Sequence, residues 1–108
     1  MSKLVANRFG LTERDLDTIY SIFERYPEVA EVRIFGSRAK GTHKKGSDID
    51  FAIMNPGVSH LTISRIKSDF SESSLPYRVD VVDFTKLEDA DLKSHIERVG
   101  EGFYTSSE

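Results

Sequence analysis

Two kinds of hydrophobic pattern alternate along the 108 residues and predict an α/β (α+β) fold, a small mixed β-sheet of about three to four strands flanked by helices. Segments with apolar residues three or four positions apart, typical of helices, alternate with short segments rich in valine and isoleucine, typical of strands. Hydrophobic residues make up 38% of the chain, which is enough to fill one core. No repeat, linker or low-complexity tract interrupts residues 1–108, so we expect a single domain.

Capping and breaking residues bound the expected helices. Thr12, followed three residues later by Asp15, resembles a capping box, and Pro27 ends this first helix because it forces the preceding residue out of the helical region. A second long helix is expected over residues 59–72, and a last one ends at Gly100. The sequence after that glycine carries no assignment.

The expected strands cover residues 30–35, 48–54 and 78–84. In the first of them small or branched apolar residues alternate with residues of other kinds, as in a strand with one face in the core. It runs directly into Gly36, where a short helix is expected if the chain turns helical at Ser37. The resulting order is helix, strand, short helix, strand, helix, strand, helix.

Acidic side chains occupy matching positions on two of these strands. Asp48 and Asp50 are two residues apart, so their side chains point to the same face of the sheet, roughly 6–7 Å apart along the backbone. Asp80 lies on the third expected strand and joins the pair if the two strands are neighbours. Asp83 competes for this third position, but its odd separation from Asp80 puts the two on opposite faces. We choose Asp80.

A cluster of this kind is costly without a cation. Two ionised carboxylates about 6 Å apart repel by roughly 3 kcal/mol at an effective dielectric constant near 20. Carboxylate oxygens suit Mg²⁺, and a pair of such ions activates an attacking oxygen and stabilises a leaving pyrophosphate. We therefore expect the aspartates to hold two Mg²⁺ ions.

A basic segment follows the first expected strand. Glycine at position 36 lets the backbone approach a bulky anion, and the hydroxyl and N–H groups of Ser37 would face a phosphate. From Arg38 to Ser47 the chain has four Lys or Arg residues and no acid, in a protein whose net charge is −3. The local charge suits a nucleoside triphosphate, whereas the acidic balance of the whole chain argues against direct nucleic-acid binding.

The Gly-Ser pair at 36–37, followed after ten residues by Asp-Ile-Asp at 48–50, resembles the signature of the nucleotidyltransferase (polymerase-beta-like) superfamily. The short chain resembles its minimal nucleotidyltransferase branch. This resemblance implies the nucleotidyltransferase fold and makes the two motif aspartates and Asp80 the catalytic, metal-binding residues. It also implies that the Gly-Ser pair, together with Arg38, binds the nucleotide.

The same resemblance implies a partner. Members of the minimal branch act as antitoxins paired with helical HEPN toxins, and some adenylylate a tyrosine of the toxin. The expected function is therefore transfer of AMP from ATP to a HEPN toxin. Two alternatives stay open, a non-catalytic antitoxin that masks its partner and a small-molecule nucleotidyltransferase.

Composition excludes several other classes of protein. The chain has no cysteine, which excludes disulfides and thiolate metal sites. It has neither the apolar run of a secretory signal nor that of a membrane span, so we expect a cytoplasmic protein that does not bind membranes. The base of the nucleotide, and whether the chain assembles with itself or with another chain, are not fixed by the sequence.

Overall fold

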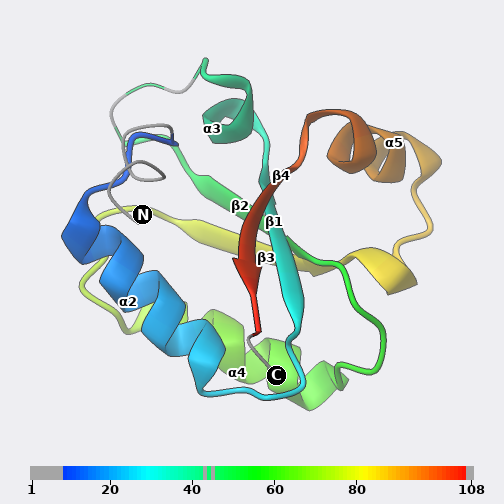
Figure 1. Cartoon of the computed structure of the whole chain (residues 1–108), viewed down its shortest axis with the longest axis horizontal. Coiled ribbons are helices and arrows are strands. Elements are labelled where there is room, and N and C mark those ends of the chain that lie inside the picture. Colours follow the sequence, from blue (N-terminus) through cyan, green and yellow to red (C-terminus); the bar gives the residue numbers. More distant parts are fainter. Residues whose placement is uncertain (1–8, 43, 45, 107–108) are drawn as a thin grey trace.

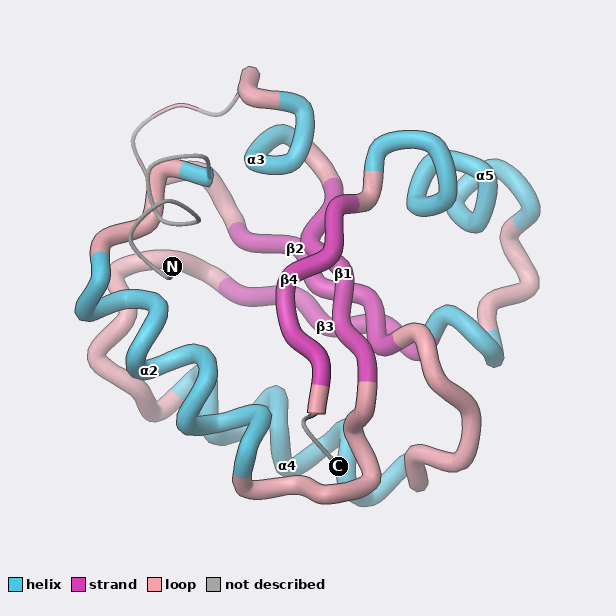
Figure 2. The backbone as a smooth tube through the Cα atoms, in the orientation of Figure 1, coloured by secondary structure: helices cyan, strands magenta, loops and turns pink. Residues whose placement is uncertain are grey.

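The computed structural model describes residues 9–42, 44 and 46–106, and it is built around one mixed four-stranded sheet (Figures 1 and 2). The strands lie in the order β3-β2-β1-β4. Their bounds are β1 Glu31–Phe35, β2 Ile49–Ile53, β3 Val79–Asp83 and β4 Glu101–Thr105. β2 and β3 run parallel, whereas β1 is antiparallel to both of its neighbours. The expected fold class is confirmed.

Helices cover both faces of this sheet. Their bounds are α2 Glu13–Glu24, α3 Ser37–Lys40, α4 His60–Ser71 and α5 Ala90–Val99, with a 3₁₀ turn, η1, at Phe84–Lys86. In Figure 1, α2 and α4 lie on one side of the sheet and α5 on the other, while α3 follows the end of β1. Among the described residues, no helix combines the length and the apolar character that crossing a membrane requires.

The expected element boundaries agree with the observed ones to within one or two residues. The capping box of α2 is present, because the Thr12 hydroxyl accepts from the Asp15 N–H and the Asp15 carboxylate accepts from the Thr12 N–H. α5 ends at Gly100 as expected, although the physical reason differs. This glycine has an ordinary φ of −64°, and a Cβ there would lie only 2.3 Å from the carbonyl oxygen of Ile96.

Strand β4 is the element that the sequence left unassigned. It pairs with β1 at the edge of the sheet, and the register shifts between Val32 and Arg33. At this bulge Phe103 turns into the core, where its ring centroid lies 4.8 Å from that of Phe51. The bulge and Gly102 break the alternation that would have marked a strand.

The alternation of side chains along β2 decides which face of the sheet carries the polar residues. Ile49, Phe51 and Ile53 are fully buried beneath α2 and α4, where Phe51 meets the rings of Phe23 and Phe70. The opposite face carries a smaller apolar cluster with Ile96 of α5 at its centre. Because side chains alternate along the strand, Asp50 points to this second face.

Candidate functional site

Strand pairing brings the predicted acidic residues together at one end of the sheet. Asp50 is the register partner of Phe35 at the end of β1 and of Asp80 near the start of β3. Directly opposed residues of neighbouring strands point to the same face, so the carboxylates of Asp50 and Asp80 lie side by side. Asp48 precedes β2 by one residue and is exposed, as Asp80 is, whereas Asp50 is half-buried.

The Asp83 carboxylate takes no part in this cluster. Asp83 pairs in register with Ile53 and is buried on the face that carries α4. Its carboxylate caps η1 by accepting hydrogen bonds from the N–H and the hydroxyl of Thr85, and it lies 3.8 Å from the ammonium group of Lys86. The strand register thus separates the two aspartates that the sequence alone left in competition, and only Asp80 stands beside Asp50.

The surroundings of Asp50 disfavour its ionised form. Burial raises the pKa of the Asp50 carboxyl above its ordinary value of 3.8, and the negative charges of Asp80 and then Asp48 raise it further. The charge of His95 in α5 opposes this shift by lowering the pKa of Asp50. The His95 ring packs edge-on against Phe35, the register partner of Asp50. The carboxylate therefore lies in surroundings that favour an additional positive charge.

These carboxylates fit magnesium in a particular manner. Among the residues that the structure describes, no three acidic or histidine side chains are grouped closely enough to enclose an ion on their own. Mg²⁺ does not need such an enclosure, because it keeps several waters and takes only one or two carboxylates together with the phosphates of a substrate. The half-buried Asp50, flanked by two exposed aspartates, matches that donor set.

Gly36 makes the close approach at this site. Its backbone has φ 77° and ψ −156°, a conformation that residues with a side chain essentially never adopt. A Cβ at this position would lie 2.4 Å from Oδ2 of Asp50, so only glycine leaves the space beside that carboxylate open. α3 begins at Ser37 with no side-chain cap, and the N–H groups of a first helical turn have no partner within the helix.

Arg38 does not extend towards this space. Its side chain is 2% exposed, and its guanidinium donates hydrogen bonds to the carbonyl oxygens of Ser47, Phe9 and Gly10. The guanidinium also lies over the ring of Tyr77, 4.5 Å from its centroid. The sequence suggested a phosphate contact for Arg38, but a side chain held in this way has its donors directed into the protein. Of the nearby lysines, Lys40 and Lys44 are exposed, and Lys45 lies outside the described residues.

His95 is a neighbour of the site that sequence reasoning missed. It lies in α5, which follows β3 along the chain, and its ring packs against that of Phe35 with the two ring centroids 6.1 Å apart. Only the tertiary placement of α5 brings it near Asp50, so no local pattern announces it.

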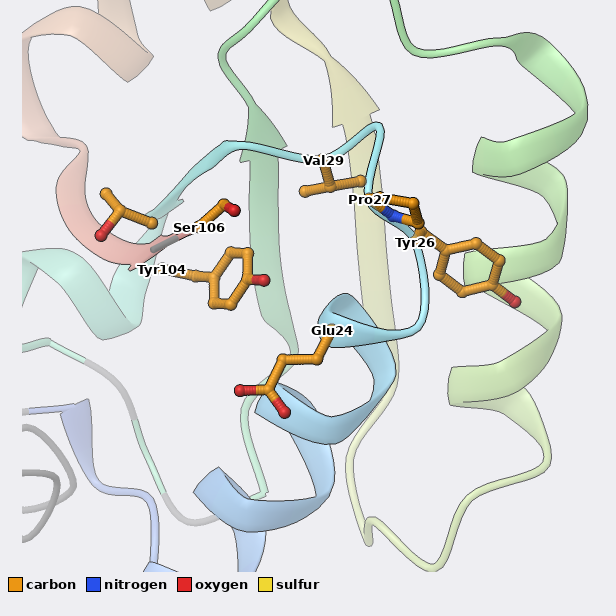
Figure 3. Close-up of a pocket in the computed structure, with 7 residues that line it drawn as sticks. Glu24, Tyr26, Pro27, Val29, Tyr104 and Ser106 are labelled. Carbon is orange, nitrogen blue, oxygen red and sulfur yellow. The ribbon is translucent and has the colours of Figure 1, made fainter. Parts of the chain in front are cut away.

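A hollow of about 540 Å³ lies apart from the aspartates, between the end of α2, the segment leading to β1, and β4 (Figure 3). Its lining residues are Glu24, Tyr26, Pro27, Val29, Tyr104, Thr105 and Ser106. None of the predicted site residues belongs to this lining, so the hollow gives no support to the chemistry predicted from the sequence.

The sequence matches the family described as "Polymerase beta, Nucleotidyltransferase" over residues 17–108. This chain belongs to that nucleotidyltransferase family. The resemblance drawn from the Gly-Ser and Asp-Ile-Asp residues is thereby confirmed. One relative of this nucleotidyltransferase is the "Probable protein adenylyltransferase MntA" of Haemophilus influenzae, which is 36% identical over 93 residues, covering 85% of this chain and 81% of the relative.

Solved structures agree on the fold. A toxin–antitoxin crystal structure with AMP-PNP superimposes with a TM-score of 0.69 at 21% identity, covering 86% of this chain and 75% of the other. A complex of a tri-AMPylated Shewanella oneidensis HEPN toxin with an MNT antitoxin gives a TM-score of 0.62 at 18% identity, covering 84% and 70%. The nucleotidyltransferase fold of the chain is therefore established at the level of structure as well as sequence.

Replacing Gly36 with alanine should disable this nucleotidyltransferase. The added Cβ collides with Asp50, and the backbone must leave its φ of 77°. Gly36 and Ser37, which we call the Gly-Ser corner, therefore move. We expect nucleotide transfer to fall by about 100-fold, because misplacing reactive groups by about 1 Å has an effect of that size. The matched control is Gly41→Ala, since Gly41 has a φ of 79° but open space around its Cβ position. Equal losses in the two variants would contradict a specific role for the space beside Asp50.

Replacing Asp50 with asparagine should stabilise the protein at neutral pH in the absence of divalent ions. The folded-state pKa of Asp50 is raised, so the folded protein binds this proton more tightly than the unfolded chain does. Stability therefore falls as the pH rises from 3.8 through the raised pKa, and Asp50→Asn removes that loss. We expect a gain in Tm of about 2–4 °C at pH 7, after allowing for solvent screening of the half-exposed group.

Thermal unfolding in EDTA at pH 7 and below pH 3.8 measures this effect. The gain should vanish at the lower pH, where the carboxyl is protonated in both states. Asp17→Asn, at an exposed position of α2, is the control and should change Tm little at either pH. A gain for Asp50→Asn that is independent of pH would show that repulsion within the cluster is not its source.

Proposed function

We propose that this nucleotidyltransferase transfers AMP from ATP to a protein partner, a helical HEPN toxin, and acts as its antitoxin. The proposal rests on the convergence of Asp48, Asp50 and Asp80 beside Gly36, in a chain 36% identical to a protein named as an adenylyltransferase. The solved toxin–antitoxin complexes, one with AMP-PNP and one with an AMPylated HEPN toxin, support the same pairing of nucleotide and partner.

Each side chain of the site has a role in this reaction. Gly36 leaves room for the triphosphate beside Asp50, and the hydroxyl and N–H groups at the start of α3 donate to its phosphate oxygens. Asp48, Asp50 and Asp80 would hold two Mg²⁺ ions, which when bound would neutralise phosphate charge and favour ionisation of the attacking hydroxyl.

The transfer is an in-line displacement at phosphorus. The oxygen of an acceptor hydroxyl forms a bond to the α-phosphorus while the bond to the bridging oxygen of pyrophosphate breaks, and pyrophosphate leaves. The hydroxyl proton goes to a carboxylate, and we assign this role to Asp80, which is exposed and lies beside Asp50. The protein contributes chiefly by holding the two substrates in this alignment.

The acceptor supplies its own surface. All strands that the structure describes belong to one sheet, which supports a single domain, and the described residues include no second module for binding an acceptor. A toxin polypeptide brings its own recognition surface, whereas a small-molecule acceptor would need a second domain or a second chain. An ATP-consuming reaction on such a partner belongs in the cytoplasm.

Transfer of radiolabel from α-labelled ATP to the HEPN partner tests the proposal. The double variant Asp48→Asn with Asp50→Asn should lose at least about 100-fold in rate, because even residues that only support metal ligands change activity by 10–100-fold. The control carries Asp17→Asn with Asp91→Asn, which changes the net charge equally at two exposed helix positions. This control should transfer label at the rate of the parent protein.

Toxin activity separates catalysis from masking. At equal expression, the double variant should fail to neutralise the toxin while still forming a complex with it. Full neutralisation without label transfer would overturn the enzymatic mechanism in favour of masking. Label appearing in a small molecule rather than in the toxin would identify the chain as a small-molecule nucleotidyltransferase.

A further inference from the structure

Asp48 is the member of the acidic cluster that the sheet does not hold. β2 begins at Ile49, so Asp50 and Asp80 are fixed by strand pairing, whereas Asp48 lies just outside the ladder. On its C-terminal side the chain is anchored by the N–H of Ile49, which donates to the carbonyl oxygen of Arg78. On its N-terminal side it is anchored at Ser47, and the anchor there is a side chain.

That anchor is the buried guanidinium of Arg38. Its Nε and Nη2 both donate to the carbonyl oxygen of Ser47, at 3.2 and 2.9 Å. Its Nη1 donates to the carbonyl oxygens of Phe9 and Gly10, at 2.9 and 3.3 Å, in the segment that precedes α2. Arg38 itself directly follows the Gly-Ser corner. The Arg38 side chain therefore connects the Gly-Ser corner to Ser47, the residue before Asp48.

The guanidinium is held in turn by an aromatic ring. Tyr77 lies beneath it and donates its hydroxyl hydrogen to Oδ2 of Asp15, the capping-box residue of α2. Tyr77 also leads into β3, the strand of Asp80. A planar group with several fixed donors, stacked on a ring, can make this arrangement, whereas a lysine ammonium is a single point of charge and cannot reproduce it.

Building on the proposed function, we infer that Arg38 is a positioning residue, which sets the distance and orientation between the Gly-Ser corner and Asp48. It acts through Ser47 and α3 and does not touch the nucleotide. This role explains why Arg38, the arginine of the basic segment, is directed inward while Lys40 and Lys44 of the same segment are exposed. It also distinguishes Arg38 from a side chain that merely fills space, because two of its hydrogen bonds reach the carbonyl oxygen of Ser47, the residue before Asp48.

The variant Arg38→Lys keeps the charge and loses the paired contact with Ser47. The Mg²⁺ concentration that gives half-maximal label transfer should rise by about 10–100-fold, as for residues that orient metal ligands, and kcat should fall. Calorimetric binding of a non-hydrolysable ATP analogue gives a readout that does not depend on activity. In the presence of Mg²⁺ the variant should bind the analogue more weakly than the parent protein does, whereas in EDTA the two should bind it about equally. Guanidinium ion added to Arg38→Ala should restore part of the rate.

Tyr26→Phe is the stability control. It removes the hydrogen bond from the Tyr26 hydroxyl to Asp69, which joins the end of α2 to α4 away from the acidic cluster. It should lower Tm without changing the Mg²⁺ requirement. If Arg38→Lys does not fold, Tyr77→Leu tests the same arrangement by removing the ring beneath the Arg38 guanidinium. A raised Mg²⁺ requirement is again expected.

The outcomes separate this inference from the function on which it rests. A parent protein that binds Mg²⁺ and the ATP analogue and transfers label, together with an Arg38→Lys variant of unchanged Mg²⁺ requirement, would overturn the positioning role alone. A parent protein that binds neither ligand would overturn the proposed function and the inference with it. An equal rise in Mg²⁺ requirement for Tyr26→Phe would show that lost stability, not lost positioning, is responsible.

Discussion

The in-register pairing of Asp50 with Asp80 on two parallel strands is the constraint on which the site depends. In-register parallel pairing puts both side chains on the same face of the sheet, and the antiparallel neighbour β1 ends beside them, with Gly36 next to Asp50. The result is a group of like charges in which the half-buried Asp50 has a raised pKa. Folding stability alone offers no reason for such an arrangement, whereas cations brought with a triphosphate would relieve the repulsion between the carboxylates.

The remainder of the fold holds Asp50 and the Gly-Ser corner in place. Alternation along β2 sends Ile49 and Phe51 into the aromatic core and leaves Asp50 on the opposite face, so the same five-residue strand both anchors the sheet and presents the carboxylate. Arg38 then ties the glycine corner to the chain before Asp48, with Tyr77 as its platform. The site is therefore built on strand ends and a buried clamp, and the exposed lysines of the loop contribute charge without fixing geometry.

Local patterns in the sequence were enough to predict most of the secondary structure. The capping box at Thr12 and Asp15, the proline at position 27 that ends the first helix and the alternation in the first strand each act through neighbouring residues, so their consequences can be predicted without knowing the fold. β4 escaped because a bulge and a glycine interrupt its alternation, and its place at the sheet edge depends on Phe103 packing against a distant core. Tertiary packing decided that element.

The candidate site divides along the same line. The Gly-Ser pair and the two motif aspartates could be proposed from the sequence, through their spacing and the family resemblance that it carries, because both lie within one short stretch of chain. Strand alternation puts Asp80 and Asp83 on opposite faces and led to the choice of Asp80. That Asp80 stands directly beside Asp50 depends on the strand register, which no local pattern contains. The inward course of Arg38 and the approach of His95 depend on elements far away in the sequence, so charge patterning placed Arg38 with the phosphate contacts and gave no sign of His95.

The most direct test is a crystal structure of the protein with Mn²⁺ in place of Mg²⁺ and a non-hydrolysable ATP analogue, with the metal located by its anomalous signal. The account predicts an anomalous peak beside Asp50, shared with Asp48 or Asp80 and with oxygens of the triphosphate, which itself lies against Gly36 and Ser37. A nucleotide bound elsewhere, for example in the hollow beside Glu24 and Tyr104, or a triphosphate at the Gly-Ser corner with no metal at the aspartates, would contradict it.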